Sequence, residues 1–193
     1  MKSCDRINHS SESSASSSES SHSYFAPVMT TAMSDDQPER ADALSPVLVI
    51  GYGNDLRSDD GAGRHAAARI DALSIPGVRI VSVHQLAPEI SDLLASAKMA
   101  IFVDAYPADE GSKIRVEKLA SSAPAPGFGH FATPGELLSF AEILYRRQPD
   151  AWIVAIPGVS FDFGESLSPT TESGVNDATI IIQELIEQHT QSV

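Results

Sequence analysis

The sequence predicts an α/β protein with three α/β/α layers, in which helices cover both faces of a mostly parallel five-stranded sheet. From Val47 onward, short apolar runs alternate with amphipathic stretches, as strands and helices do around a parallel sheet. The first run, Val47–Tyr52, is apolar and ends in glycine-rich sequence, which is typical of a buried parallel strand. Lys113–Leu119 instead alternates polar and apolar residues, which predicts an edge strand with one face in water.

The other elements follow in alternation. We expect strands at Arg79–His84, Met99–Ala105 and Trp152–Pro157, and helices at Asp59–Leu73, Pro88–Ala97, Thr133–Arg147 and Thr171–Gln188. Pro88 suits the first turn of its helix. Thr133 with Glu136 three residues later is the signature of a capping box. Folds of this kind bind ligands at the carboxyl ends of the strands, near the point where the strand order reverses.

Residues 1–44 differ in composition from the rest of the chain. They are rich in serine, poor in apolar residues and without periodicity, so we expect a disordered leader ahead of a single domain at residues 45–193. Either the leader is genuine, or translation starts near Met33 and residues 1–32 reflect an overextended gene start. The leader lacks the apolar segment of a secretory signal, so we expect a cytoplasmic protein.

Composition excludes several functions. No apolar run approaches the roughly 20 residues of a membrane span, and the single cysteine, Cys4, excludes a disulfide framework or a CxxC site. The net charge is −13, and −9 remains when residues 1–44 are left out. Such an acidic domain argues against nucleic acid as a partner. It mildly favours cationic partners or metal ions.

The densest group of chemically informative residues is IGYGNDLRSDDGAG (Ile50–Gly63). A dinucleotide-binding fingerprint would need a third glycine, but Leu56 stands at that position. Asp59 and Asp60 at the start of the expected helix would also repel a pyrophosphate. We expect Asp59 to have a structural role, either capping the helix or complementing its dipole, and Asp60 to project into the crevice at the sheet edge.

Two further residues are candidates for the same crevice. Asp104 ends an apolar strand, where a carboxylate needs a partner or a ligand. His130 lies in a glycine-rich loop just ahead of a helix. Two carboxylates and an imidazole would make an open site for a divalent transition metal. His84 ends the second strand, and we favour a plain hydrogen-bonded role for it over a place in the crevice.

Other hydrolase motifs are missing. The zinc-protease motif HExxH is absent. Gly158–Asp162 lacks the last glycine of a nucleophile elbow, so Ser160 is interpreted as a loop residue.

Five stretches together resemble the hydrogenase maturation endopeptidases. In order, between about Val47 and Ile186, they are VIGYGNDLRSDDGAG, HQLAPEISDLL, FVDA, GHFATPGELL and GESLSP. The resemblance implies a phosphorylase/hydrolase-like fold and cleavage of a C-terminal extension from a nickel–iron hydrogenase large-subunit precursor after nickel insertion. It places the family's metal-contacting and catalytic residues on Asp60, Asp104 and His130. Many members have glutamate at the position of Asp60, so the side chain here is one methylene shorter.

The resemblance also implies that nickel arrives with the precursor and serves as the recognition motif, rather than being held as a permanent cofactor. Two other functions stay open. One is a non-catalytic metal-sensing chaperone or binding module on the same fold, and the other is an unrelated peptidase acting on a different protein.

Overall fold

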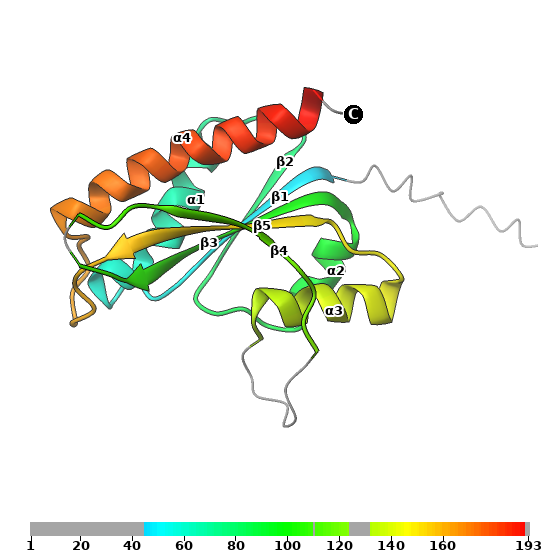
Figure 1. Cartoon of the computed structure of the whole chain (residues 1–193), viewed down its shortest axis with the longest axis horizontal. Helices are drawn as coiled ribbons and strands as arrows, with labels where there is room; N and C mark the ends of the chain where they lie inside the picture. The colour runs from blue at the N-terminus through cyan, green and yellow to red at the C-terminus, as the bar shows by residue number, and fades with distance from the viewer. Residues whose placement is uncertain (1–44, 110, 124–131, 192–193) are drawn as a thin grey trace, which may run out of the picture. The chain divides into compact units, whose positions relative to one another are not determined.

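The structure, a computed structural model, describes residues 45–109, 111–123 and 132–191. The predicted leader, residues 1–44, lies outside this part of the chain. The strands are β1 (Ser45–Tyr52), β2 (Val78–Val83), β3 (Ala97–Pro107), β4 (Arg115–Leu119) and β5 (Asp150–Gly158). The helices are the 3₁₀ helix η1 (Ser58–Gly61), α1 (Ala62–Ala72), α2 (Ile90–Ala95), α3 (Pro134–Tyr145) and α4 (Pro169–Gln191) (Figure 1).

The five strands form one sheet in the order β2-β1-β3-β5-β4. Neighbouring strands are parallel except for β4, which pairs antiparallel with β5. β4 is therefore an edge strand, as the alternation in its sequence predicts. The chain moves from β1 to β2 on one side and then places β3 on the other side of β1, so the strand order reverses at β1 and β3.

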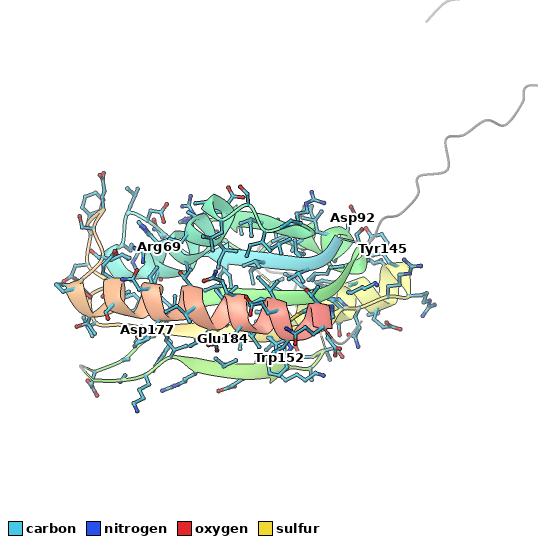
Figure 2. The ribbon with its side chains drawn as sticks, turned by 90° about the horizontal axis from the view of Figure 1, so that it is seen from above. Arg69, Asp92, Tyr145, Trp152, Asp177 and Glu184 are labelled. Carbon is cyan, nitrogen blue, oxygen red and sulfur yellow. The ribbon has the colours of Figure 1, made fainter. Side chains whose placement is uncertain are left out.

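Helices cover both faces of the sheet, which confirms the predicted three-layer α/β/α class. On one face α1 and α4 pack on the sheet through residues such as Ala66 and Ile182. On the other face α2 and α3 pack through residues such as Leu94 and Leu137. Arg69, labelled in Figure 2, lies between α1 and α4. It joins the two helices by a hydrogen bond to Asn176 and an ion pair with Glu172, both of 2.5 Å.

The local signals in the sequence correspond to observed helix ends, with two differences. Thr133 and Glu136 form the predicted capping box at the start of α3. The expected helix at Asp59–Leu73 is divided into η1 and α1, and α2 is shorter than expected. Residues before α2 form tight turns instead, in which the Ser91 amide donates to the Pro88 carbonyl at 3.0 Å.

Close packing of α1 on the sheet requires glycine. A Cβ atom on Gly63 would overlap the carbonyl oxygens of Val103 and Tyr52. The glycine thus lets α1 approach the carboxyl ends of β1 and β3 directly. None of the helices in the described part of the chain combines the length and apolar character that a membrane span requires.

Candidate functional site

A cavity of about 270 Å³ lies at the carboxyl ends of β1, β2 and β3, where the strand order reverses. Its lining residues are Tyr52, Gly53, Asp60, His84, Gln85, Leu86, Asp104 and Ala132. The position agrees with the general rule for open α/β sheets. Two of the three predicted site residues, Asp60 and Asp104, are thus brought to one cavity although 44 positions separate them in the chain.

Asp104 reaches the cavity because side chains alternate between the two faces of β3. Phe102 packs in the core on the α2 and α3 face, whereas Val103 packs on the other face. Asp104 therefore lies on the same face as Phe102. Its Oδ1 accepts a hydrogen bond from the Ala105 amide at 2.8 Å, and the Tyr52 hydroxyl on the neighbouring strand also hydrogen-bonds to its carboxylate.

Burial raises the pKa of Asp104 to about 6, from an ordinary value of 3.8. The hydrogen bonds from Tyr52 and Ala105 oppose this effect, and the negative charge of Asp60 adds to it. The pKa of Tyr52 is also raised, because of burial first and then the charge and hydrogen bond of Asp104. A carboxyl with a pKa near 6 can exchange protons close to neutral pH, as a general acid or base must.

Asp60 lies in η1, the 3₁₀ turn that follows β1 and its connecting loop. Its Oδ2 accepts a hydrogen bond from the Asn54 amide at 3.0 Å. Gly53 has a φ of +134°, and a Cβ atom there would overlap the Asp60 carbonyl oxygen. Gly53 therefore lets the backbone pass close to Asp60, a requirement unrelated to nucleotide binding.

Asp59 does not cap its own helix, so the capping prediction is wrong. The side chain is 0% exposed. Its Oδ2 accepts hydrogen bonds from the amides of Val159 and Ser160 and from the Ser168 hydroxyl, at 2.8–2.9 Å. Its Oδ1 accepts one from the Ser168 amide at 2.6 Å.

Asp59 thus fastens the loop between β5 and α4 to the turn that carries Asp60. Burial disfavours its charged form, but the hydrogen bonds from Ser168, Val159 and Ser160 outweigh burial and lower the pKa. The role is structural, as expected, but it acts across the fold. Ser160 belongs to this connection, which supports its interpretation as a loop residue.

The two histidine candidates have different outcomes. His130 lies outside the described residues; Ala132, two positions later, lines the cavity, and its amide donates to the Leu86 carbonyl at 3.1 Å. His84 also lines the cavity, and its side chain has no hydrogen-bond partner within residues 45–109, 111–123 and 132–191. His84 therefore has a place in the crevice, which its sequence context did not favour.

Neither His84 nor Tyr52 was predicted as a site residue. The only signal was position: Tyr52 ends β1, the strand beside the one that carries Asp104, and His84 directly follows β2, the strand on the other side of β1. In the described ranges, no three His, Cys, Asp or Glu side chains are arranged to hold a metal ion. Asp60 and Asp104 could supply two oxygen ligands, and a cation between them would offset both the burial of the Asp104 charge and the smaller repulsion from Asp60.

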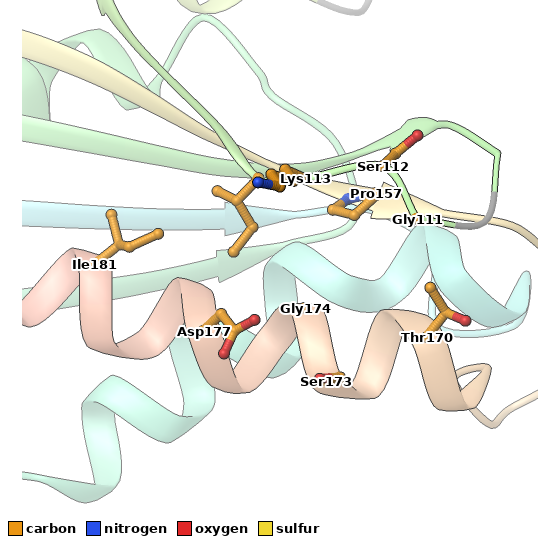
Figure 3. Close-up of a pocket in the computed structure, with 10 residues that line it drawn as sticks. Gly111, Ser112, Lys113, Pro157, Thr170, Ser173, Gly174, Asp177 and Ile181 are labelled. Carbon is orange, nitrogen blue, oxygen red and sulfur yellow. The ribbon is translucent and has the colours of Figure 1, made fainter.

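A larger cavity, of about 610 Å³, lies on the α4 side of the sheet (Figure 3). Lys113 and Asp177 are its only charged lining residues among those described. This cavity lacks the paired carboxylates of the smaller one, so its size does not make it the better candidate for catalysis.

Comparison with known proteins gives matches of structure only. No family model matches the chain, and no curated protein matches its sequence. Hydrogenase maturating endopeptidase HybD from E. coli superposes with a TM-score of 0.60 and 18% identity, over 74% of this chain and 93% of that one. The [NiFe] hydrogenase maturation protease HybD from Thermococcus kodakarensis superposes with a TM-score of 0.56 and 21% identity, over 72% of this chain and 98% of that one. HycI from Thermococcus kodakarensis, also a [NiFe] hydrogenase maturation protease, superposes with a TM-score of 0.58 and 18% identity, over 74% of this chain and 93% of that one. The chain therefore has the fold of the hydrogenase maturation proteases.

Proposed function

We propose that this chain is an endopeptidase that removes a C-terminal extension from a nickel–iron hydrogenase large-subunit precursor after nickel insertion. The observation that carries the proposal is the meeting of Asp60 and Asp104 in one cavity at the switch point of the sheet. The motif resemblance and the shared fold support it independently. The precursor is the expected partner, and the cytoplasm the expected location.

In this proposal nickel belongs to the precursor and is part of the substrate. Asp60, Asp104 and His130 would contact the metal seated in the precursor and so distinguish loaded from empty precursor. The chemistry of the two described residues fits this role, because carboxylates bind divalent cations. The acidic domain, with its net charge of −9, also favours a cationic ligand.

Hydrolysis of a peptide needs a water oxygen to attack the scissile carbonyl carbon and a proton to reach the departing nitrogen. We propose that Asp104 takes the proton from the water, because its pKa of about 6 is the one raised towards neutral pH. The carbon–nitrogen bond then breaks, and the proton passes to the new amino terminus. Release of the extension would make the step irreversible in practice.

The mass of the precursor C-terminus before and after mixing with the protein tests this function. Nickel-loaded precursor should lose the extension, whereas nickel-free precursor should keep it. Asp60→Asn, Asp104→Asn and His130→Ala should each abolish processing while the variants stay folded in thermal melts. Asp71→Asn, which changes an exposed carboxylate on α1, is the matched control and should process normally.

The same experiment separates the alternatives. Binding of loaded precursor without any loss of mass would favour a metal-sensing chaperone or binding module. Normal processing by one of the three variants would remove that residue from the site. Normal processing by all three would refute the assignment of this cavity as the catalytic site.

A further inference from the structure

We propose that Arg115, stacked on Tyr106, forms an anion-binding subsite for a carboxylate group of the precursor's C-terminal extension. This inference rests on the proposed function and adds a specificity determinant to it. The subsite lies beside the cavity of Asp60 and Asp104, and it is formed by residues of β3 and β4 that do not line that cavity.

The sheet register places Arg115 in line with Asp104. Asp104 on β3 pairs with Ala155 on β5, and Ala155 pairs with Arg115 on β4. Two strand spacings separate the Cα atoms of Asp104 and Arg115, which corresponds to roughly 10 Å. The residue between them is alanine, whose methyl group leaves room above the sheet.

Arg115 and Asp104 also lie on the same face of the sheet. Along β4, Leu119 packs in the core on the α2 and α3 face, and alternation puts Arg115 on that face as well. Tyr106 is two positions after Asp104 on β3, so its side chain lies on this face too. In Figure 1, α2 and α3 lie toward the amino ends of the parallel strands, and β3 and β5 extend beyond them. Asp104, Ala155 and Arg115 lie near the carboxyl ends of β3 and β5, and no helix in the described part of the chain covers them there.

The Arg115 side chain is held in place but keeps its hydrogen-bond donors. Its guanidinium carbon lies 4.0 Å from the centroid of the Tyr106 ring. The Tyr106 hydroxyl donates to the Lys113 carbonyl at 2.7 Å, which fixes the ring. Stacking uses the flat face of the guanidinium group, whereas its N–H donors point outward in the plane.

Arg115 has no charged partner among the residues that the structure describes. Arg64 is paired with Asp55, and Arg69 with Glu172. Arg115 forms no such ion pair within the described ranges. An oriented and unpaired guanidinium group is suited to two parallel hydrogen bonds with a carboxylate.

The distance defines which part of the substrate would reach this group. An extended peptide advances about 3.3 Å per residue, so a scissile bond at Asp104 puts Arg115 about three residues away. The domain is acidic, so an anionic extension is repelled overall and gains a favourable contact mainly at this local positive charge. The carboxylate that Arg115 would bind is either an acidic side chain or the terminal carboxylate of the extension.

Processing kinetics with matched substrates test the subsite. The substrates are nickel-loaded precursor, precursors in which each acidic residue of the extension is changed to its amide, and precursor with an amidated C-terminus. Arg115→Ala should raise KM for unmodified precursor about 10- to 100-fold, the effect of losing hydrogen bonds to a charged group, and leave kcat nearly unchanged. With the one substrate that lacks the recognised carboxylate, wild type and Arg115→Ala should have equal KM values.

Two further variants make the result specific. Arg115→Lys should recover part of the loss, because it keeps the charge without the planar fork. Arg79→Ala, at an exposed arginine on the opposite edge strand β2, should match wild type. If Arg115→Ala leaves KM unchanged, or raises it equally for every modified substrate, the subsite is refuted.

Failure of the proposed function gives a different result. If wild-type protein binds the precursor without cutting it, the same comparison is made with dissociation constants, and the same pattern is expected. If wild-type protein neither binds nor cuts the precursor, the proposed function fails and the subsite fails with it.

Discussion

Replacement of Asp104 by asparagine should stabilise the fold at neutral pH and abolish processing. Burial raises the pKa of Asp104 to about 6 in the folded protein, so the folded state holds this proton more tightly than the unfolded state does. The free energy of unfolding therefore decreases as pH rises from about 4 to about 6. Above that range the ionised carboxylate destabilises the fold by about 1–3 kcal/mol.

Asparagine removes this charge and can keep the local contacts. Its side-chain oxygen can accept from the Ala105 amide, as Asp104 does at 2.8 Å. Its NH₂ group can donate to the Tyr52 hydroxyl. The variant should therefore gain about 1–3 kcal/mol at neutral pH, and this gain should disappear below about pH 3, where the carboxyl group of wild type is protonated in both states.

Urea unfolding followed by the fluorescence of Trp152, the single tryptophan, measures the difference at both pH values. Asp71→Asn is the control for changing an exposed carboxylate, and it should alter the free energy of unfolding by less than about 0.5 kcal/mol. An Asp104→Asn variant that is less stable than wild type at neutral pH would contradict the reasoning. It would mean that the Asp104 charge is stabilised in the fold.

Three other variants test the turns around the site. Asp59→Asn should lower the free energy of unfolding by about 1–3 kcal/mol relative to Asp71→Asn, because an amide leaves at least one buried donor without an acceptor; equal urea curves would contradict the fastening role. Gly53→Ala should cost at least about 1–2 kcal/mol and reduce processing by displacing Asp60, as melts and cleavage assays would reveal; normal values of both would rule this out. Thr133→Ala should cost about 1 kcal/mol in urea unfolding without changing kcat, and unchanged stability would argue against the cap.

The features of the fold that depend on residues close together in the sequence could be predicted from it. Strand and helix positions follow from periodicity, and the capping box of Thr133 with Glu136 needs only residues three positions apart. The expected meeting of Asp60 and Asp104 also had a physical basis, because β1 and β3 are neighbours and their carboxyl ends meet at one edge. His130 remains a prediction.

The role of Asp59 could not be predicted in the same way. Its partners, Val159, Ser160 and Ser168, lie 100 or more positions further along the chain. A sequence shows an aspartate before a helix, for which the local helix cap is the ordinary interpretation. Only the fold reveals that the carboxylate faces a distant loop. The alignment of Asp104 with Arg115 likewise depends on strand pairing, which the alternation of residues does not determine.

The connection through Asp59 has a consequence for how this protein can change. The Asp60 turn and the segment from Val159 to Ser168 share one buried anion, so an insertion or deletion in either would also shift the other. Transplanting one of these segments alone from a structural relative should therefore misplace Asp60, whereas transplanting both together should preserve its position. For protein engineering the two segments therefore have to be exchanged as one unit, although about a hundred residues of sequence lie between them.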